Sequence, residues 1–263
     1  RAPILCSLRW MDLETQTPQR RVTIALFTYD FPPFIGGISA YTLNLAKGLG
    51  EQGHEVHVVC PGSPWDAGVP GVSVHRFDAS GSDFRRYRKG RSVLDGVVGA
   101  LRPDVLHAVS SIAHLALGRM DESTLPRVMT LHGTEILRSL TPKGFGRFRD
   151  ALFRPAYMEA DRIICVSRFT RSLAESHGLP ADRLVVVHNG VDTSPRYHPP
   201  EADSEVRARY GLFGKKILLT VAHLHPRKGQ MEVLRALPDI LRVVPEAAYV
   251  MVGAGDALDN LRL

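Results

Sequence analysis

From residue 21 onward, short apolar runs alternate with stretches in which apolar residues recur at helical spacing. We predict buried strands at 22–28, 55–60, 72–77, 104–108, 127–131, 162–166 and 184–188, with helices near 38–52, 84–101, 146–160 and 168–177 between them. Strand–helix–strand units with short polar turns pair in parallel through right-handed crossovers. The alternation therefore predicts a doubly wound α/β sheet.

A proline-rich stretch, NGVDTSPRYHPP at 189–200, interrupts this pattern and is predicted to be a linker. A helix at 203–210, a strand at 216–222, a helix at 229–243 and a strand at 248–252 are expected after it. We divide the chain into an N-terminal arm with little structure (1–20), a first domain (21–195) and the start of a second domain (196–263). Two parallel strands cannot form a stable sheet by themselves, so we expect the second domain to be incomplete.

The chain has 263 residues and a formal net charge of +6, which suits anionic partners such as phosphates, lipid head groups or nucleic acid. No run of aromatic and basic residues is typical of a nucleic-acid platform, and we expect no nucleic-acid partner. Cys6, Cys60 and Cys165 lie far apart without zinc-finger spacing. We expect Cys60 and Cys165 to be inert packing residues in a protein of the reducing cytoplasm.

The strongest functional signal follows the strand at 216–222. The apolar run leads into a polar turn with His223, His225, Arg227 and Lys228, and a helical pattern begins at Gly229. Cationic side chains thus meet the free N–H groups of a helix N-terminus, an arrangement that favours phosphate. This turn is predicted to bind a diphosphate.

Ligands of open α/β sheets bind beyond the carboxyl ends of the strands, and two further strand ends draw attention. Gly36 and Gly37 lead from the first strand into a helix, where they either let the backbone approach a phosphate or sugar or form an ordinary turn. His132 follows the strand at 127–131 and either contacts a substrate or is a satisfied polar residue.

The remaining strand ends give weaker signals. Ser167 is best explained as a helix cap, whereas Arg168, in the first turn, opposes the helix dipole and is better explained by a ligand. Asn189 and Gly190 suit a plain turn. Gly253 belongs to a GxG sequence without the third glycine of a dinucleotide motif, and we interpret it as a tight loop.

Several chemistries are not indicated. The sequence has no GxxxxGK phosphate loop, no GxSxG elbow, no histidine pair at zinc-binding spacing and no paired-carboxylate motif. We therefore expect neither a covalent nucleophile nor a metal.

Taken together and in order, six segments resemble the retaining GT-B glycosyltransferases of family 4, which transfer a sugar from an NDP-sugar donor. They span about residues 21–256 and read FPPFIGGISAYTLNLAKGLGEQGHEVHVVCP, TLHGTE, ADRIICVSRFTRSLAESHGL, RLVVVHNGVD, LLTVAHLHPRKGQMEVLRALP and AYVMVGAGD.

The resemblance implies two Rossmann-like domains facing across a cleft, with the acceptor mainly on the first and the nucleotide mainly on the second. By position, His132 would lie at the transferred sugar, and Lys228 would hold the diphosphate. The diphosphate site would also include Gly36, Gly37, His223 and Arg227, and further substrate contacts would come from Glu135, Arg168, Asn189 and Gly253. The leaving diphosphate would help to deprotonate the acceptor on the same face, giving retention with neither a cofactor nor a metal.

Two departures from the family pattern matter. His223 stands where the family usually has an arginine, which predicts weaker diphosphate binding unless Arg227 substitutes. The family's later segment, with two glutamates for the donor ribose and sugar, is not reached. We expect the 263 residues alone to have little or no transferase activity.

Basic residues gather at 85–91 and again at 138–154, where apolar residues are mixed among them. This mixture favours docking onto anionic lipid at the inner face of the plasma membrane, although a solvated basic face or an acceptor-phosphate site would have the same composition. The leading hypothesis is hexosyl transfer to a glycan or lipid-linked acceptor of the cell envelope. The alternatives are a non-catalytic remnant that binds the acceptor or a partner, and a UDP-sugar epimerase of GT-B fold; a nicotinamide dehydrogenase is disfavoured.

Overall fold

The computed structural model describes residues 20–62, 68–120, 125–139, 145–191 and 200–262. The chain divides into two compact units, of which the first ends at Gly190 and the second begins at Val191. Each unit is described by itself. The N-terminal arm expected at 1–20 lies almost wholly outside the described residues.

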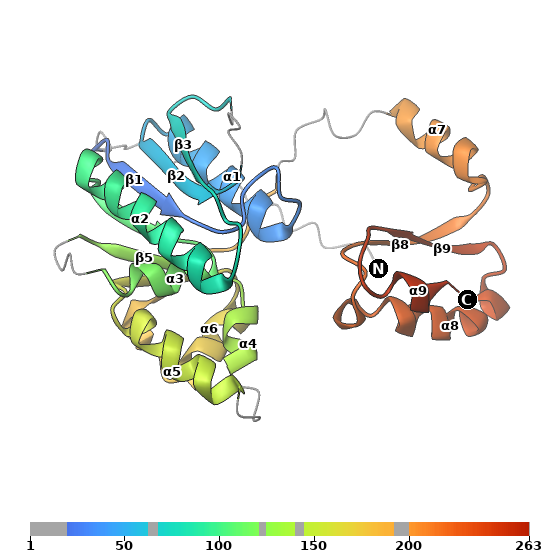
Figure 1. The fold of residues 1–263 in the computed structure, drawn as a ribbon. Coiled ribbons are helices and arrows are strands. Elements are labelled where there is room, and N and C mark those ends of the chain that lie inside the picture. The colour runs from blue at the N-terminus through green and yellow to red at the C-terminus, as the bar shows by residue number, and fades with distance from the viewer. Residues whose placement is uncertain (1–19, 63–67, 121–124, 140–144, 192–199, 263) are drawn as a thin grey trace. The chain divides into compact units, whose positions relative to one another are not determined.

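The first unit contains a seven-stranded, fully parallel sheet in the order β3-β2-β1-β4-β5-β6-β7 (Figure 1). Its strands are β1 (Thr23–Phe27), β2 (Glu55–Pro61), β3 (Val72–Phe77), β4 (Val105–Ala108), β5 (Arg127–Leu131), β6 (Arg162–Cys165) and β7 (Leu184–Val186). Every strand predicted for this unit is present, and the doubly wound α/β fold is confirmed. The chain reverses direction across the sheet between β1 and β4, the place where open α/β sheets bind ligands.

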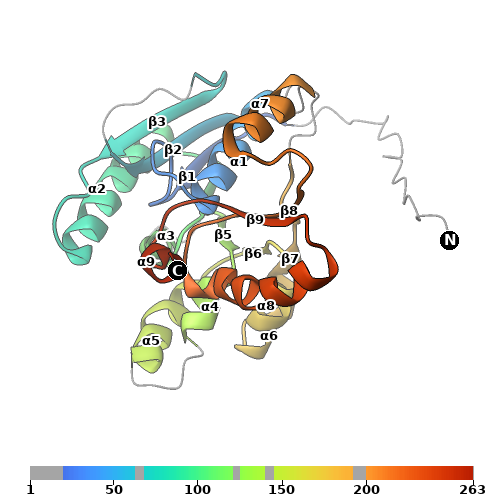
Figure 2. The same cartoon turned by 90° about the vertical axis from the view of Figure 1, so that its right-hand side faces the viewer.

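Helices cover the two faces of this sheet and bury two separate apolar clusters (Figures 1 and 2). Helix α1 packs on one face, where Ala46 meets Ile24, Leu26 and Val56. The larger cluster lies on the other face and takes side chains from the remaining helices of the unit. These are α2 (Asp83–Leu101), α3 (Ser111–Leu117), α4 (Thr134–Ser139), α5 (Phe145–Met158) and α6 (Arg168–Ser176). Helix α1, on the first face, spans Gly37–Glu51.

Two of these helices, α3 and α4, were not predicted. Helix α3 reads SIAHLAL and buries Ala113, His114, Ala116 and Leu117, so it presents no polar face that would reveal a helical period. Helix α4 has only six residues.

The second unit contains a two-stranded parallel sheet, β8–β9. Its elements are α7 (Pro200–Tyr210), β8 (Lys216–Val221), the short 3₁₀ turn η3 (Pro226–Lys228), α8 (Gln230–Val243), β9 (Ala247–Val252) and α9 (Leu258–Leu261). Helix α8 packs against β9, while Leu219, Val221 and Val252 of the two strands are exposed. Within the described ranges, no helix of either unit is both long and apolar enough to cross a membrane.

Two cysteines confirm the packing role predicted for them. Cys60 and Cys165 are free thiols buried at the ends of β2 and β6. Burial raises the pKa of Cys60 to about 12 and that of Cys165 to about 11, which keeps both thiols protonated and unreactive at neutral pH.

Candidate functional site

The loop after β1 leads into the N-terminus of α1 through Gly36 and Gly37, both of which are exposed. The first N–H groups of a helix have no partner within it, so they remain available to a ligand. A Cβ at Gly37 would meet no atom within 4 Å, so the fold itself leaves space beside this residue. The helix start predicted here is therefore open to an approaching anion or sugar.

His132 follows β5 and lies against α1. Its ring meets the ring of Tyr41 edge-on, with centroids 4.9 Å apart. Burial lowers the pKa of His132 to about 4, so the imidazole is neutral at physiological pH. A neutral ring can both donate and accept hydrogen bonds, which suits contact with sugar hydroxyls.

A buried histidine of the sheet, His107, also has a lowered pKa, of about 4. His107 of β4 contacts Thr130 of β5 through its Nε2, 2.8 Å from Oγ1. The Tyr41 hydroxyl lies 3.5 Å from the same Thr130 oxygen. These polar contacts connect the centre of the sheet to the helix that supports His132.

Glu135, expected to be a substrate contact, is only 3% exposed. Its carboxylate accepts a hydrogen bond from the backbone N–H of His132, 3.2 Å away. Gly133, between them, has a φ of 96°, which suits glycine. In this structure Glu135 thus fixes the turn that carries His132.

Three further residues of the first unit follow strand ends: Ser167 is half-buried, and Arg168 and Asn189 are exposed. Ser167 caps α6, since its hydroxyl accepts a hydrogen bond from the Thr170 N–H at 3.0 Å, as predicted. Arg168 and Asn189 both lie on the surface after the ends of neighbouring strands, β6 and β7.

In the second unit, the turn between β8 and α8 carries the predicted cations. His223, Arg227 and Lys228 are exposed, and Lys228 ends η3 directly before Gly229, whose φ of 74° turns the chain into α8. His225 Nδ1 accepts from the Arg227 N–H at 3.2 Å. Buried Gln230 donates to the His223 carbonyl at 3.2 Å. The turn is thus held internally while its charged side chains face outward.

Gly253 has a structural explanation in the same unit. A Cβ at Gly253 would overlap the Ala222 carbonyl oxygen, and one at Gly255 would overlap that of Leu224. The Leu224 N–H donates to the Ala254 carbonyl at 2.9 Å. The tight loop predicted after β9 is therefore present, and it packs directly on the turn that leads to Lys228.

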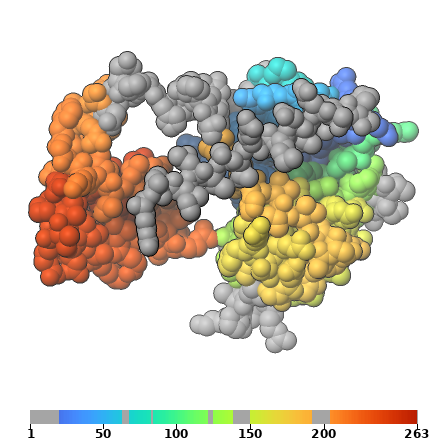
Figure 3. Space-filling model, turned by 180° about the vertical axis from the view of Figure 1, so that it is seen from behind, coloured from blue at the N-terminus to red at the C-terminus, as the bar shows by residue number. Residues whose placement is uncertain are grey.

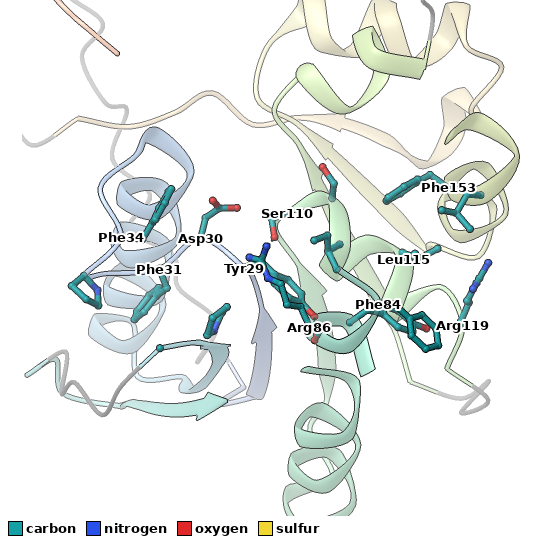
Figure 4. Close-up of a pocket in the computed structure, with 17 residues that line it drawn as sticks. Tyr29, Asp30, Phe31, Phe34, Phe84, Arg86, Ser110, Leu115, Arg119 and Phe153 are labelled. Atoms are coloured by element: carbon teal, nitrogen blue, oxygen red, sulfur yellow. Dashed lines mark hydrogen bonds between the residues drawn. The ribbon is translucent and has the colours of Figure 1, made fainter. Parts of the chain in front are cut away.

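The structure also reveals a pocket of about 950 Å³ in the first unit that the sequence did not indicate (Figure 4). It opens beside the ends of β1, β2 and β4 and extends along α2, α3 and α5. Its polar residues are Asp30, Arg86, Ser110, Ser111 and Arg119. The Arg86 guanidinium lies over the Tyr29 ring, 5.9 Å from its centroid.

At the polar end of this pocket lies Asp30. Burial raises the pKa of its carboxyl group, and the nearby charge of Arg86 opposes that rise. Ser110 is held by the Tyr29 N–H, which donates to its Oγ at 2.8 Å. A carboxylate, a guanidinium and hydroxyls in one pocket can bind a polyhydroxylated ligand that carries negative charge.

The basic stretch on α2 divides into paired and exposed charges. Lys89 pairs with Asp78, and Arg91 pairs with Asp95 at 2.7 Å. Arg85 and Arg88 are exposed. Most side chains of the second basic cluster, up to residue 149, lie outside the described residues.

Arg154, in the described part of that cluster, has a structural contact. Its guanidinium donates to the His177 carbonyl at 2.7 Å, and His177 also contacts Asp150 at 2.6 Å. These contacts join α5 to the end of α6. The two helices form one continuous surface (Figure 3).

Comparisons with known proteins show the family. The model of Glycosyltransferase Family 4 matches residues 35–195. The chain is 33% identical over 251 residues to the GDP-mannose-dependent alpha-(1-6)-phosphatidylinositol monomannoside mannosyltransferase of Mycolicibacterium smegmatis, covering 90% of this chain and 62% of the relative. It is 31% identical to the phosphatidyl-myo-inositol mannosyltransferase of the same organism, over 90% of this chain and 59% of that protein.

A solved structure shares the fold. Anabaena HepE, crystallised with UDP and glucose, matches with a TM-score of 0.67 and 19% identity, over 92% of this chain and 64% of HepE. The chain spans less than two thirds of the length of each of these proteins. The family match nevertheless covers more than half of the chain, and the chain belongs to glycosyltransferase family 4.

Proposed function

We propose that this chain carries the donor-diphosphate and acceptor sites of a retaining hexosyltransferase that acts in glycolipid synthesis of the cell envelope. The observation that carries the proposal is the exposed cationic turn at Lys228, placed at the carboxyl end of β8 and the N-terminus of α8. Two relatives named as mannosyltransferases support the same chemistry. GDP-mannose is accordingly the first donor to test.

In this proposal Lys228 and the first N–H groups of α8 bind the donor diphosphate. As the sugar–phosphate bond breaks, negative charge grows on the leaving diphosphate, and a fixed cation stabilises it more in the transition state than in the ground state. Arg227 and His223 extend the cationic surface. The donor is a substrate, and the proposal involves no metal or cofactor.

The first unit supplies the acceptor side. We propose that His132 contacts the transferred sugar through its neutral ring and that Gly36 and Gly37 lie next to the donor phosphate and acceptor. The pocket at Asp30 and Ser110 would hold the acceptor head group. Arg168 and Asn189 remain proposed substrate contacts, while the contacts of Glu135 and Gly253 support indirect roles through His132 and the Lys228 turn.

We also propose that the protein works at the cytoplasmic face of the plasma membrane as a peripheral protein. Exposed Arg85 and Arg88 on α2 support contact with anionic lipid. The two Mycolicibacterium smegmatis relatives are named for phosphatidylinositol lipids, which supports contact with the same surface.

The test is calorimetric binding of GDP compared with GMP, and of UDP compared with UMP, to the 263-residue chain, with GDP-mannose and UDP-glucose titrated alongside. If the diphosphate is recognised at Lys228, removal of the β-phosphate lowers affinity by about 30-fold, the effect of a charge-assisted contact worth ~2 kcal/mol. Equal binding of mono- and diphosphates contradicts the proposal and favours a non-catalytic remnant. Interconversion of a UDP-sugar without transfer would instead identify an epimerase.

A further inference from the structure

We propose that the apolar half of the pocket in the first unit binds a hydrocarbon chain of the acceptor. This inference rests on the proposed function for the identity of the ligand as an acceptor. It adds that the acceptor is an amphiphile whose chain lies in the protein, in a site distinct from the donor turn at Lys228.

The pocket has a polar half and a mainly apolar half (Figure 4). Asp30, Ser110 and the guanidinium of Arg86 lie together beside the ends of β1 and β4, and Phe31 and Phe34 lie next to Asp30. Phe84, Leu115 and Phe153 lie at the other end, on α2, α3 and α5 respectively, and Arg119 lies beside them. A ligand that fills both halves must combine a polar head with an apolar portion.

The apolar half is formed by side chains at the edge of the main apolar cluster that remain in contact with solvent. Tyr87, Ile112, Leu115 and Leu152 pack against the main apolar cluster yet remain partly exposed, and all four line the pocket. Phe84 extends this surface outward and is 68% exposed. Apolar side chains that line a concave surface and stay in contact with water favour an apolar ligand.

A hydrocarbon chain fits this half better than a peptide does. A peptide would bring backbone N–H and C=O groups into a region whose walls are mainly apolar, and unsatisfied polar groups are costly there. A hydrocarbon chain has no such groups. At about 950 Å³ the pocket is at the upper end of small-molecule sites, which leaves room for a head group and a chain segment together.

Charge indicates which head group accompanies the chain. Asp30 is the single carboxylate in the lining that the structure describes, whereas two arginines line the pocket. Arg86 lies beside Asp30 at the polar end, and Arg119 lies at the other end, near Phe84 (Figure 4). The lining as a whole therefore carries an excess positive charge, and the Arg86 guanidinium can donate to an anionic head such as a phosphodiester. The occupant that fits is an amphiphile with an anionic head and a hydrocarbon chain.

The test is a series of alkyl phosphates, from methyl to octyl, titrated below their micelle concentrations into the full chain without nucleotide. If the chain enters the pocket, affinity rises with each methylene by up to about fourfold, which corresponds to ~0.8 kcal/mol. Inorganic phosphate separates binding of the head alone from binding of the amphiphile. Affinities that do not depend on chain length overturn the proposal.

Matched variants locate the effect. Phe84→Ser changes an exposed pocket residue and Leu115→Gln changes the pocket wall, while Phe169→Ser changes a residue of the same unit that is 65% exposed and does not line the pocket. We expect both pocket variants to reduce the dependence on chain length and Phe169→Ser to preserve it. Melting curves check the fold, and the exposed position of Phe84 makes its variant informative even if Leu115→Gln fails to fold.

Two outcomes would overturn the assignment. One is an unchanged chain-length dependence in Phe84→Ser. The other is a wild-type dimer in sedimentation experiments that Phe84→Ser dissociates, since a second copy of the chain would then cover this face. The alkyl phosphate titration contains no nucleotide. If it fails, the proposed donor site at Lys228 is unaffected; if nucleotide binding fails, the alkyl phosphate titration can still be interpreted.

Discussion

The ring of Tyr41 stands edge-on to the ring of His132, at an interplanar angle of 84° and a centroid separation of 4.9 Å. Tyr41 belongs to α1, the helix that begins at Gly37, whereas His132 follows β5. The contact therefore joins the first turns of α1 to the segment after β5, about 90 residues further along the chain. It also shields the imidazole from water, in keeping with its lowered pKa.

Tyr41→Leu should expose the His132 ring. Because burial keeps the pKa of His132 at about 4, better hydration is expected to raise it toward the ordinary value of 6.5. Titration of the imidazole Cε1–H signals by NMR measures this shift. Tyr41→Phe keeps the ring and serves as the control, and an unchanged pKa in Tyr41→Leu would show that other groups bury His132.

Stability should fall as the pH drops below neutral. Burial lowers the pKa of His107 to about 4, of His114 to about 3 and of His132 to about 4. Each value lies below the 6.5 of the unfolded chain, so the unfolded state binds more protons between pH 6.5 and pH 4. The stabilisation is complete above pH 6.5 and is lost as the pH falls through this window, at about 1.4 kcal/mol per pH unit for each histidine.

Urea denaturation at several pH values measures this dependence. His107→Gln removes one titrating group while retaining a polar partner for Thr130, so the slope of unfolding free energy against pH should decrease by about 1.4 kcal/mol per pH unit. A slope equal to that of the wild type would mean that His107 does not contribute.

Gly37→Ala separates ligand binding from folding. A Cβ at Gly37 meets nothing within 4 Å, so the variant should fold as the wild type does. If a donor or acceptor approaches this helix start, the added methyl group should weaken binding of the NDP-sugar by about tenfold. Gly48→Ala in the same helix also meets no neighbouring atom and is the matched control. Equal affinities in the two variants would remove Gly37 from the site.

Gly253→Ala should loosen the second unit. The new Cβ would overlap the Ala222 carbonyl oxygen at a φ of 153°, which should cost about 2–3 kcal/mol. Hydrogen exchange of the amides of β8 and β9, followed by mass spectrometry, provides a local measure. Gly190→Ala meets no atom within 4 Å and should change little. Unaltered protection in Gly253→Ala would disprove the close packing of this loop.

The parts of the fold predicted from sequence are those governed by local pattern. The run TIALF of β1 is almost wholly buried, and strands of that kind are visible as continuous apolar runs. Helix α3 could not be found this way, because His114 and its alanine and leucine neighbours are buried together without a polar face.

The candidate site also has one part that the sequence predicted and one part that it did not. The Lys228 turn was predictable because the strand, the cations and the helix follow one another in sequence. The pocket was not, since Asp30, Arg86 and Ser110 come from separate segments that only the strand order brings together. The hydrogen bond between the Glu135 carboxylate and the His132 N–H was not predicted either, because sequence alone does not show which backbone group a buried carboxylate meets.

Binding of GDP-mannose to Lys228→Ala tests the central claim most directly. Lys215→Ala is the control, since Lys215 is an exposed lysine of the same unit just before β8 begins, away from the turn where the strand ends. We predict that Lys228→Ala lowers the affinity for the nucleotide sugar by about 30-fold, or ~2 kcal/mol, and that Lys215→Ala leaves it unchanged. Equal affinities for Lys228→Ala and the wild type would contradict the assignment of this turn as the diphosphate site.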